Sequence, residues 1–194
     1  MSVIHGVLSR EKAVELVRKH VKRENLFKHI MAVEAIMSAM AEEVGANEGV
    51  WAMAGLLHDV DFDETYDDPS RHGLRSVEIL EEEAGGEVSE EILRAVKAHN
   101  PEYTGVDPET KMECALLSAD AVSGLIVATA LVMPSKRLAD VAPENVQNRF
   151  GEKDFARRCS RKNMKLCERA GVPLERFFEV SLRALQNIAN ELGL

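Results

Sequence analysis

The sequence predicts an all-α protein, a helical bundle with additional helices at its C-terminal end. Apolar residues recur at helical spacing through most of the chain, whereas the alternating pattern typical of strands is almost absent. Residues that favour helix starts and stops separate these apolar segments. At 194 residues, with 45% hydrophobic and 29% charged residues, the chain is long enough for one domain with a substantial core.

Five helices are expected in the first half of the chain, over residues 9–21, 25–45, 47–58, 73–85 and 89–99. Their expected N-caps are Ser9, Asn25, Asn47 and Ser89, because side-chain oxygens of these residue types accept hydrogen bonds from first-turn amides. Glycines are expected to end the second and fourth helices. The third ends at the dipeptide His58-Asp59, after a long apolar segment.

The second half begins with an expected loop at residues 100–108 and continues with a long apolar helix at 109–133, which Pro134 ends. A short helix is expected near Pro143, another over 152–170 and a last one over 173–194. No repeat or low-complexity linker interrupts the chain. We therefore predict a single domain over residues 1–194, in which residues 134–194 form a helical extension packed on the core.

The apolar segment 115–133 approaches the ~20 residues that a membrane span requires. Asp120 lies within it, and a carboxylate there costs about 2.5–3.5 kcal/mol on insertion scales. We therefore expect a buried helix and no membrane association. The three cysteines form no C-x-x-C pair, and the first residues lack the apolar centre of a signal peptide, so a cytoplasmic protein with free thiols is expected.

The net charge of −9 is unevenly distributed and argues against a general nucleic-acid binder. Residues 134–170 contain ten Lys or Arg and five acids, which leaves the remainder of the chain strongly acidic. This basic segment is either a solvated helix face or a positive wall beside a site for an anionic substrate. One Trp and two Tyr offer little surface for stacking a polymer, which favours a small phosphorylated molecule over long nucleic acid.

Six residues carry the chemistry that the sequence predicts: His29, His58, Asp59, His72, His99 and Asp120. Imidazole and carboxylate together suit Fe, Mn, Co, Ni or Zn. Taken alone, His29 fits a hydrogen-bonded core histidine, and His72 and His99 fit surface residues beside loops. The pair His58-Asp59 and the carboxylate of Asp120 fit such roles poorly, because buried ionisable groups need a partner. Together the six predict a metal site built from separate helices.

The pattern of His29, His58-Asp59 and Asp120 resembles the HD superfamily of metal-dependent phosphohydrolases. His72, in HGLRSVEIL, and His99, in ILRAVKAHN, resemble the extra ligands of its dinuclear, HDIG-type branch. The resemblance covers about residues 25–130, the expected HD metal-binding core. The C-terminal stretch is similar to a group of small bacterial predicted HD hydrolases.

This resemblance implies a helical bundle in which His29, His58, Asp59 and Asp120 hold one metal ion. Asp59 would bridge to a second ion that His72 and His99 complete, so His58 and Asp59 are the expected catalytic residues. The expected cofactors are two divalent ions, Fe or Mn first, with Ni, Co, Zn or Mg as alternatives. The implied reaction is hydrolysis of a phosphate ester or anhydride, for example of a nucleotide, by a water that bridges the two ions.

The chain departs from the family pattern directly after the His-Asp pair. Where many relatives read HDIGK, this chain reads HDVDF, with Asp61 at the glycine and Phe62 at the lysine. Because that lysine contacts phosphate in several relatives, another cation is expected to bind the substrate. The candidates are Arg75, Lys97, Lys136, Arg137 and Arg161. The acids after His58-Asp59, Asp61 among them, are expected to form a solvated rim.

Two other classes of function remain open. The same six ligands serve di-iron oxygenases that resemble this fold, and a non-catalytic signalling or binding HD domain is the second alternative. A non-catalytic domain typically lacks ligands, whereas this chain has all six. The sequence leaves open whether the protein is a monomer or a homodimer.

Overall fold

The computed structural model describes residues 7–194, and all regular structure in this range is helical, as predicted. The longer helices are α1 (Arg10–His20), α2 (Glu24–Val44), α3 (Glu48–Leu57), α4 (Leu74–Ala84), α5 (Glu90–Ala98), α7 (Lys111–Val132), α8 (Pro143–Gly151) and α11 (Leu174–Asn187). The short elements are η1 (Pro69–Arg71), α6 (Pro101–Thr104), η2 (Leu138–Asp140), α9 (Arg161–Met164), α10 (Cys167–Ala170) and α12 (Ala189–Leu192). The expected absence of a leader rests partly on residues 1–6, which lie outside this range.

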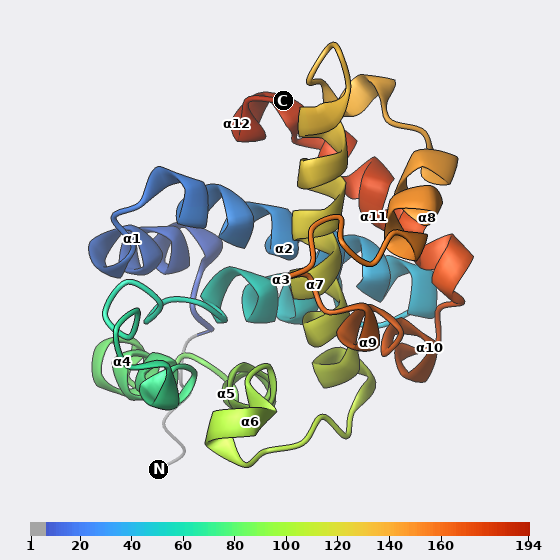
Figure 1. The fold of residues 1–194 in the computed structure, drawn as a ribbon. Helices are drawn as coiled ribbons and strands as arrows, with labels where there is room; N and C mark the ends of the chain where they lie inside the picture. Colours follow the sequence, from blue (N-terminus) through green and yellow to red (C-terminus); the bar gives the residue numbers. More distant parts are fainter. Residues whose placement is uncertain (1–6) are drawn as a thin grey trace.

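Helix α7 stands in the middle of the molecule, with α1, α4, α5 and α6 on one side, α8 to α11 on the other, and α2 and α3 passing behind it (Figure 1). It is long and apolar enough to cross a membrane, but 67% of its most apolar 18-residue window is buried among the other helices. A central helix that packs against neighbours on most of its surface must be apolar on most of its faces, which explains its composition. The carboxylate of Asp120 projects from the middle of this helix.

Helices α2 and α3 pack closely because Gly55 has no side chain. A Cβ atom at this position would lie 2.9 Å from Cα of Glu34, inside van der Waals contact with the α2 backbone. The buried face of α2 includes Ile30, Val33 and Met37, all fully inaccessible to solvent. This close approach sets the distance between His29 on α2 and His58 at the end of α3.

The helix caps follow the sequence in part. Ser9 accepts a hydrogen bond from the amide of Lys12, and Asn47 accepts one from Val50, as predicted. Helix α2, however, begins at Glu24, so Asn25 is not its N-cap; the carboxylate of Asp63 accepts the amides of Lys22 and Arg23 instead. A distant acid therefore fixes the residues just before α2, and no side chain caps the helix itself.

Two segments differ from the prediction. The expected loop at 100–108 contains the short helix α6, and the expected helix over 152–170 is instead a loop at 152–160 followed by α9 and α10. The cause of the second difference is Arg161, whose guanidinium donates hydrogen bonds to the carbonyls of Arg149, Phe150, Glu152, Phe155, Ala156 and Cys159. Carbonyls that turn toward one side chain cannot also form a helix ladder.

Candidate metal centre

The six predicted ligands come from five segments that the fold brings together. His29 lies on α2 and Asp120 on α7, whereas His58 and His99 cap the C-terminal ends of α3 and α5. Asp59 follows His58, and His72 lies between η1 and α4. Two groups of ligand atoms each lie within 4.8 Å of one another: His29, His58 and Asp120 form one, and Asp59, His72 and His99 form the other.

Asp59 lies between the two groups and directs one carboxylate oxygen to each. Its Oδ2 is 3.4 Å from Nε2 of His58 and 3.6 Å from Nε2 of His29. Its Oδ1 is 3.4 Å from Nε2 of both His72 and His99. A carboxylate that turns one oxygen to each of two ligand sets has the arrangement of a bridge between two ions.

The spacing of these atoms matches that of a coordination shell. Ligand atoms about 2.1 Å from one ion are separated by about 3.0–3.4 Å when they subtend right to tetrahedral angles at it. The Nε2 atoms of His72 and His99 are 3.0 Å apart, and Nε2 of His29 is 3.2 Å from Oδ1 of Asp120. Each group therefore leaves room for one ion of ordinary size.

Each histidine is held through its other ring nitrogen, Nδ1. Those of His58 and His99 lie at hydrogen-bonding distance from the carbonyls of Gly55 and Val96, so they donate and leave the lone pair on Nε2. Nδ1 of His72 contacts Oδ1 of Asp61 at 2.8 Å, and Nδ1 of His29 contacts Oγ of Ser123 at 3.2 Å. Such contacts orient metal-binding histidines and fix their tautomers.

The strongest single indication of a metal is Nε2 of His58. This atom is buried and has no hydrogen-bond partner among the described residues. A buried polar atom without a partner costs about 1–3 kcal/mol. An ion bound by His58, His29 and Asp120 would remove this cost, so the donor set fits a divalent metal.

The charges within the cluster also favour an ionised Asp59, the form of the carboxylate that binds a metal ion. Burial raises the pKa of Asp59, but contacts with His58, His72 and His99 outweigh it and hold that pKa well below its usual range. Burial lowers the pKa of His72, but hydrogen bonds to Asp59 and Asp61 and their negative charge raise it to about 10. Without a metal, His72 is therefore protonated at neutral pH and Asp59 is ionised.

Metal binding at pH 7 should consequently release about one proton or more per chain, because the imidazole must be neutral to bind an ion. His72 keeps its proton up to about pH 10 in the metal-free protein, so metal affinity should rise with pH toward that value. Calorimetric titration with Mn²⁺ in two buffers of different ionisation enthalpy measures the release. Equal heats in both buffers would contradict the protonated state of His72.

Asp61 belongs to this centre and not to a solvated rim, which corrects the expectation from the sequence. Its side chain is fully buried, contacts Nδ1 of His72 and accepts hydrogen bonds from the backbone amides of Gly73 and Ser76 at 2.8 and 3.1 Å. It thus ties His72 to the first turn of α4. Asp61, which stands at the position of the glycine in HDIG, therefore orients the ligand His72.

Gly73 allows His72 to approach His99. Its φ of +86° lies in the region that L side chains rarely adopt. A Cβ atom there would lie 3.3 Å from the carbonyl oxygen of Val96 and 3.5 Å from Cε1 of His99. The side-chain amide of Asn100 donates a hydrogen bond to the carbonyl oxygen of His72 at 3.1 Å. This bond holds the same two segments together.

The cluster is open to solvent at His29 and Asp120. The side chains of His58, His99 and Asp59 are 0, 3 and 7% exposed, whereas those of His29 and Asp120 are 26 and 37% exposed. A pocket of about 410 Å³ leads to this side and is also lined by Leu26, Phe62, Asn100 and Asn163. A substrate can reach the cluster from this pocket.

Comparison with known proteins agrees with this geometry. The model of the HD domain family matches residues 26–124, about half of the chain. The chain belongs to the HD domain family. This HD domain is 34% identical over 100 residues to ribonuclease Y of Rubrobacter xylanophilus and 30% identical over 101 residues to that of Oleidesulfovibrio alaskensis. Each match covers 52% of this chain but only 18% of the relative.

Solved structures show the same fold. The crystal structure of the HD domain of the L. monocytogenes phosphodiesterase PgpH superposes with a TM-score of 0.56, at 14% sequence identity, over 91% of this chain and 98% of that one. A second crystal structure of that domain, in complex with cyclic-di-AMP, superposes equally well over 96% of its chain. At this identity the likeness establishes the fold.

The structure does not bring the five predicted substrate-binding cations of this HD domain into the pocket at the cluster. Arg75 pairs with Glu64, Glu78 and Glu82, and Arg137 pairs with Asp140. The donors of Arg161 are taken by backbone carbonyls, which gives it a structural role. Lys97 is half-buried on α5, and Lys136 is exposed beyond the end of α7. Phe62, at the position of the motif lysine, does line the pocket.

Arg157 and Arg158 are basic residues that the sequence did not single out. They lie exposed on the loop 152–160, with no ion pair or hydrogen bond from either side chain among residues 7–194. This loop crosses in front of α7 (Figure 1). A Cβ atom on Gly124, one turn after Asp120, would lie 2.8 Å from Sγ of Cys159. The loop therefore rests on α7 beside the open side of the cluster.

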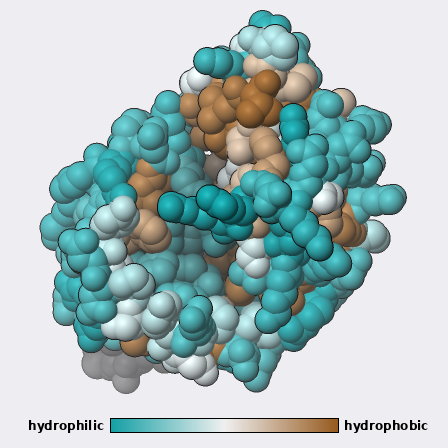
Figure 2. Space-filling view, in the orientation of Figure 1, coloured by the Kyte–Doolittle hydropathy of each residue, from teal (hydrophilic) through white to brown (hydrophobic). Residues whose placement is uncertain are grey.

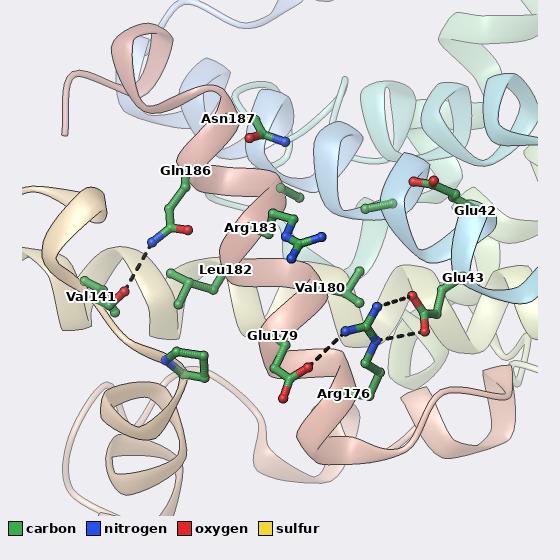
Figure 3. A pocket seen from close by; sticks show the side chains of 13 residues that line it. Glu42, Glu43, Val141, Arg176, Glu179, Val180, Leu182, Arg183, Gln186 and Asn187 are labelled. Carbon is green, nitrogen blue, oxygen red and sulfur yellow. Dashed lines mark hydrogen bonds and ion pairs between the residues drawn. The ribbon is translucent and has the colours of Figure 1, made fainter.

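A further cavity lies elsewhere and contains none of the six ligands. It has a volume of about 590 Å³ and lies between α2, α11 and residues 141–143 (Figure 3). Arg176 pairs there with Glu43 and Glu179, and Gln186 donates to the carbonyls of Leu138 and Val141. Its lining includes no histidine, cysteine or aspartate, so the cavity presents no comparable set of metal ligands.

Proposed function

We propose that this HD domain is a metal-dependent phosphohydrolase that acts on a phosphate ester or anhydride of a small molecule. Membership of the family and the cluster of His and Asp residues support divalent metal binding. The observation that carries the proposal is the orphaned Nε2 of His58 beside an Asp59 that faces both ligand groups. Two divalent ions bound there would lower the pKa of a water and stabilise charge on the phosphoryl group.

The residues of the chain hold and orient this centre. His29, His58 and Asp120 would bind one ion, His72 and His99 the other, and Asp59 both. Phe62 and Leu26 cover part of the pocket with apolar surface, which limits access of water to the cluster. The amides of Asn100 and Asn163 line the same pocket and can donate hydrogen bonds to phosphate oxygens.

A nucleotide is the class of substrate that we favour. The PgpH domain of the same fold has been crystallised with cyclic-di-AMP, which supports a nucleotide ligand in this pocket. The ribonuclease Y relatives bear a name that points to RNA, but the match spans less than a fifth of their length. The net charge of −9 and the few aromatic residues favour a small nucleotide over a polymer.

Arg157 and Arg158, which lie on the loop beside the cluster but outside the lining of its pocket, are the residues that we propose for binding the phosphate oxygens. Replacing either one by Glu should raise KM about tenfold or more, because one charge-assisted hydrogen bond contributes about 1.5–3 kcal/mol. Metal content should not change. Arg183→Glu, an equal change of charge at the distant cavity on α11, is the matched control. Equal effects of Arg158→Glu and Arg183→Glu on KM would show that only the overall charge matters.

Hydrolysis by the Mn²⁺- or Fe²⁺-loaded protein, measured as release of inorganic phosphate from phosphomonoesters and anhydrides and by chromatography of the products from phosphodiesters, tests the proposed function. The panel should include nucleoside mono-, di- and triphosphates, a cyclic dinucleotide and single-stranded RNA, alongside an oxygen-uptake assay. Release from a nucleotide that requires metal would support the proposal. Oxygen uptake by the fully loaded protein without hydrolysis of any member of the panel would instead favour the di-iron oxygenase alternative. Absence of both activities would favour a non-catalytic domain.

A further inference from the structure

A second pocket adjoins the metal cluster and has no role in holding the ions. It has a volume of about 450 Å³ and lies between α2, α7 and the last residues of the chain. His29 lines both this groove and the pocket at the cluster. Figure 2 shows hydrophobic surface gathered over the C-terminal half of α7, beside a hollow. A molecule whose phosphate lies at the cluster can therefore extend into the groove.

Helix periodicity explains why the groove starts at the metal ligands. On α7, Gly124, Val127 and Leu131 follow Asp120 at intervals of four, three and four residues, which places all four on one helix face. On α2, His29 and Ala32 stand three residues apart on one face. The two faces that supply ligands at one end thus supply the walls of the groove further along.

The lining of the groove indicates what it can hold. Its walls are aliphatic, with Ala32, Val127, Leu131 and Leu192, and Leu131 is 48% exposed. Asn25 and Lys28 stand at its polar edge, and neither side chain makes an ion pair or hydrogen bond among the described residues. Aliphatic walls with a few free polar groups are typical of small-molecule sites, and about 450 Å³ is within their usual range.

We infer that this groove binds the nucleoside of the substrate, with the base between α2 and α7 and its polar edge toward Asn25 and Lys28. The inference rests on the proposed function and names its specificity site. A single lysine is too little positive charge for a second phosphate group. A purely aliphatic chain would gain no contact with the amide of Asn25 and the ammonium of Lys28, whereas a base or ribose offers them hydrogen-bond acceptors.

Substitution of Val127 tests the inference. Val127→Trp fills the groove two helical turns from Asp120, and Val132→Trp, exposed on the same helix and outside the groove lining, is the matched control. With Mn²⁺-loaded protein, Val127→Trp should lower the ratio of kcat/KM for adenosine 5′-monophosphate to kcat/KM for methyl phosphate at least tenfold. Val132→Trp should leave this ratio as in the native protein.

Binding of adenosine provides a readout that does not depend on hydrolysis. Calorimetric titration should show affinity for adenosine reduced at least tenfold by Val127→Trp and severalfold by Asn25→Ala, with the melting temperature checked for each variant. Equal adenosine affinity in the native protein and Val127→Trp, with hydrolysis intact, would overturn the inference and leave the proposed function standing. An effect on octyl phosphate alone would assign the groove to an alkyl chain.

Failure of the proposed function gives a different result. In that case metal-loaded native protein releases no phosphate from adenosine 5′-monophosphate or methyl phosphate, while adenosine binding still reports on the groove. Absence of adenosine binding by the native protein overturns the nucleoside assignment whatever the activity.

Discussion

Asp59→Ala is expected to lose both metal ions and all phosphate-releasing activity. Oδ1 and Oδ2 of Asp59 face different ligand groups, so its removal takes one ligand from each site and the negative charge from between them. The four histidines would then repel one another when protonated. We expect a loss of metal affinity larger than the roughly 10–100-fold that is typical when a residue hydrogen-bonded to a ligand is removed. Metal content after dialysis against a defined concentration of Mn²⁺ measures the effect.

Asp67→Ala is the control for this variant, because Asp67 is an exposed acid of the following loop. It should keep the native metal content. Asp59→Asn separates charge from shape, since the amide retains the size of the carboxylate but has only one acceptor oxygen. If Asp59→Asn or Asp59→Ala retains two ions per chain, Asp59 does not bridge.

Asp61→Ala is expected to lose chiefly the ion bound by His72 and His99 and to destabilise the fold. The substitution frees the ring of His72 and leaves the buried amides of Gly73 and Ser76 without acceptors, at about 1–3 kcal/mol each. Affinity for the second ion should fall about 10–100-fold. Metal titration, together with denaturant unfolding of the metal-free protein, separates the two effects.

Asp63→Ala is the matched control, because Asp63 accepts amides at the start of α2 and does not contact His72. It should lower stability while both ions remain. A variant Asp61→Ala that binds two ions with native affinity would show that His72 needs no orienting carboxylate.

The fold class and the convergence of the six ligands could be predicted because they depend on local patterns. Helical periodicity, the caps at Ser9 and Asn47 and the pair His58-Asp59 after an apolar helix are all readable along the chain. That Asp59 would lie between two groups of ligands followed only from the family resemblance. Spacing along the chain does not fix which helices pack together.

The roles of Arg161 and Asp61 were predicted wrongly because they depend on contacts between distant segments. Arg161 carries the charge of a substrate-binding residue, but its hydrogen bonds to carbonyls as far back as Arg149 exist only in the folded loop. Asp61 stands among acidic residues, and its burial follows from contacts with α4. One feature of the sequence could have indicated the burial of Asp61. Ser76, four residues after His72, is a small polar residue on the helix face to which the carboxylate of Asp61 binds.

The six ligands are expected to hold two metal ions with Asp59 between them. The most direct test is anomalous diffraction from crystals of Mn²⁺-loaded protein, recorded at a wavelength where manganese scatters anomalously. We predict two peaks about 3.5–4 Å apart, one beside His29, His58 and Asp120 and the other beside His72 and His99. A single peak, or none within the cluster, would contradict the dinuclear centre.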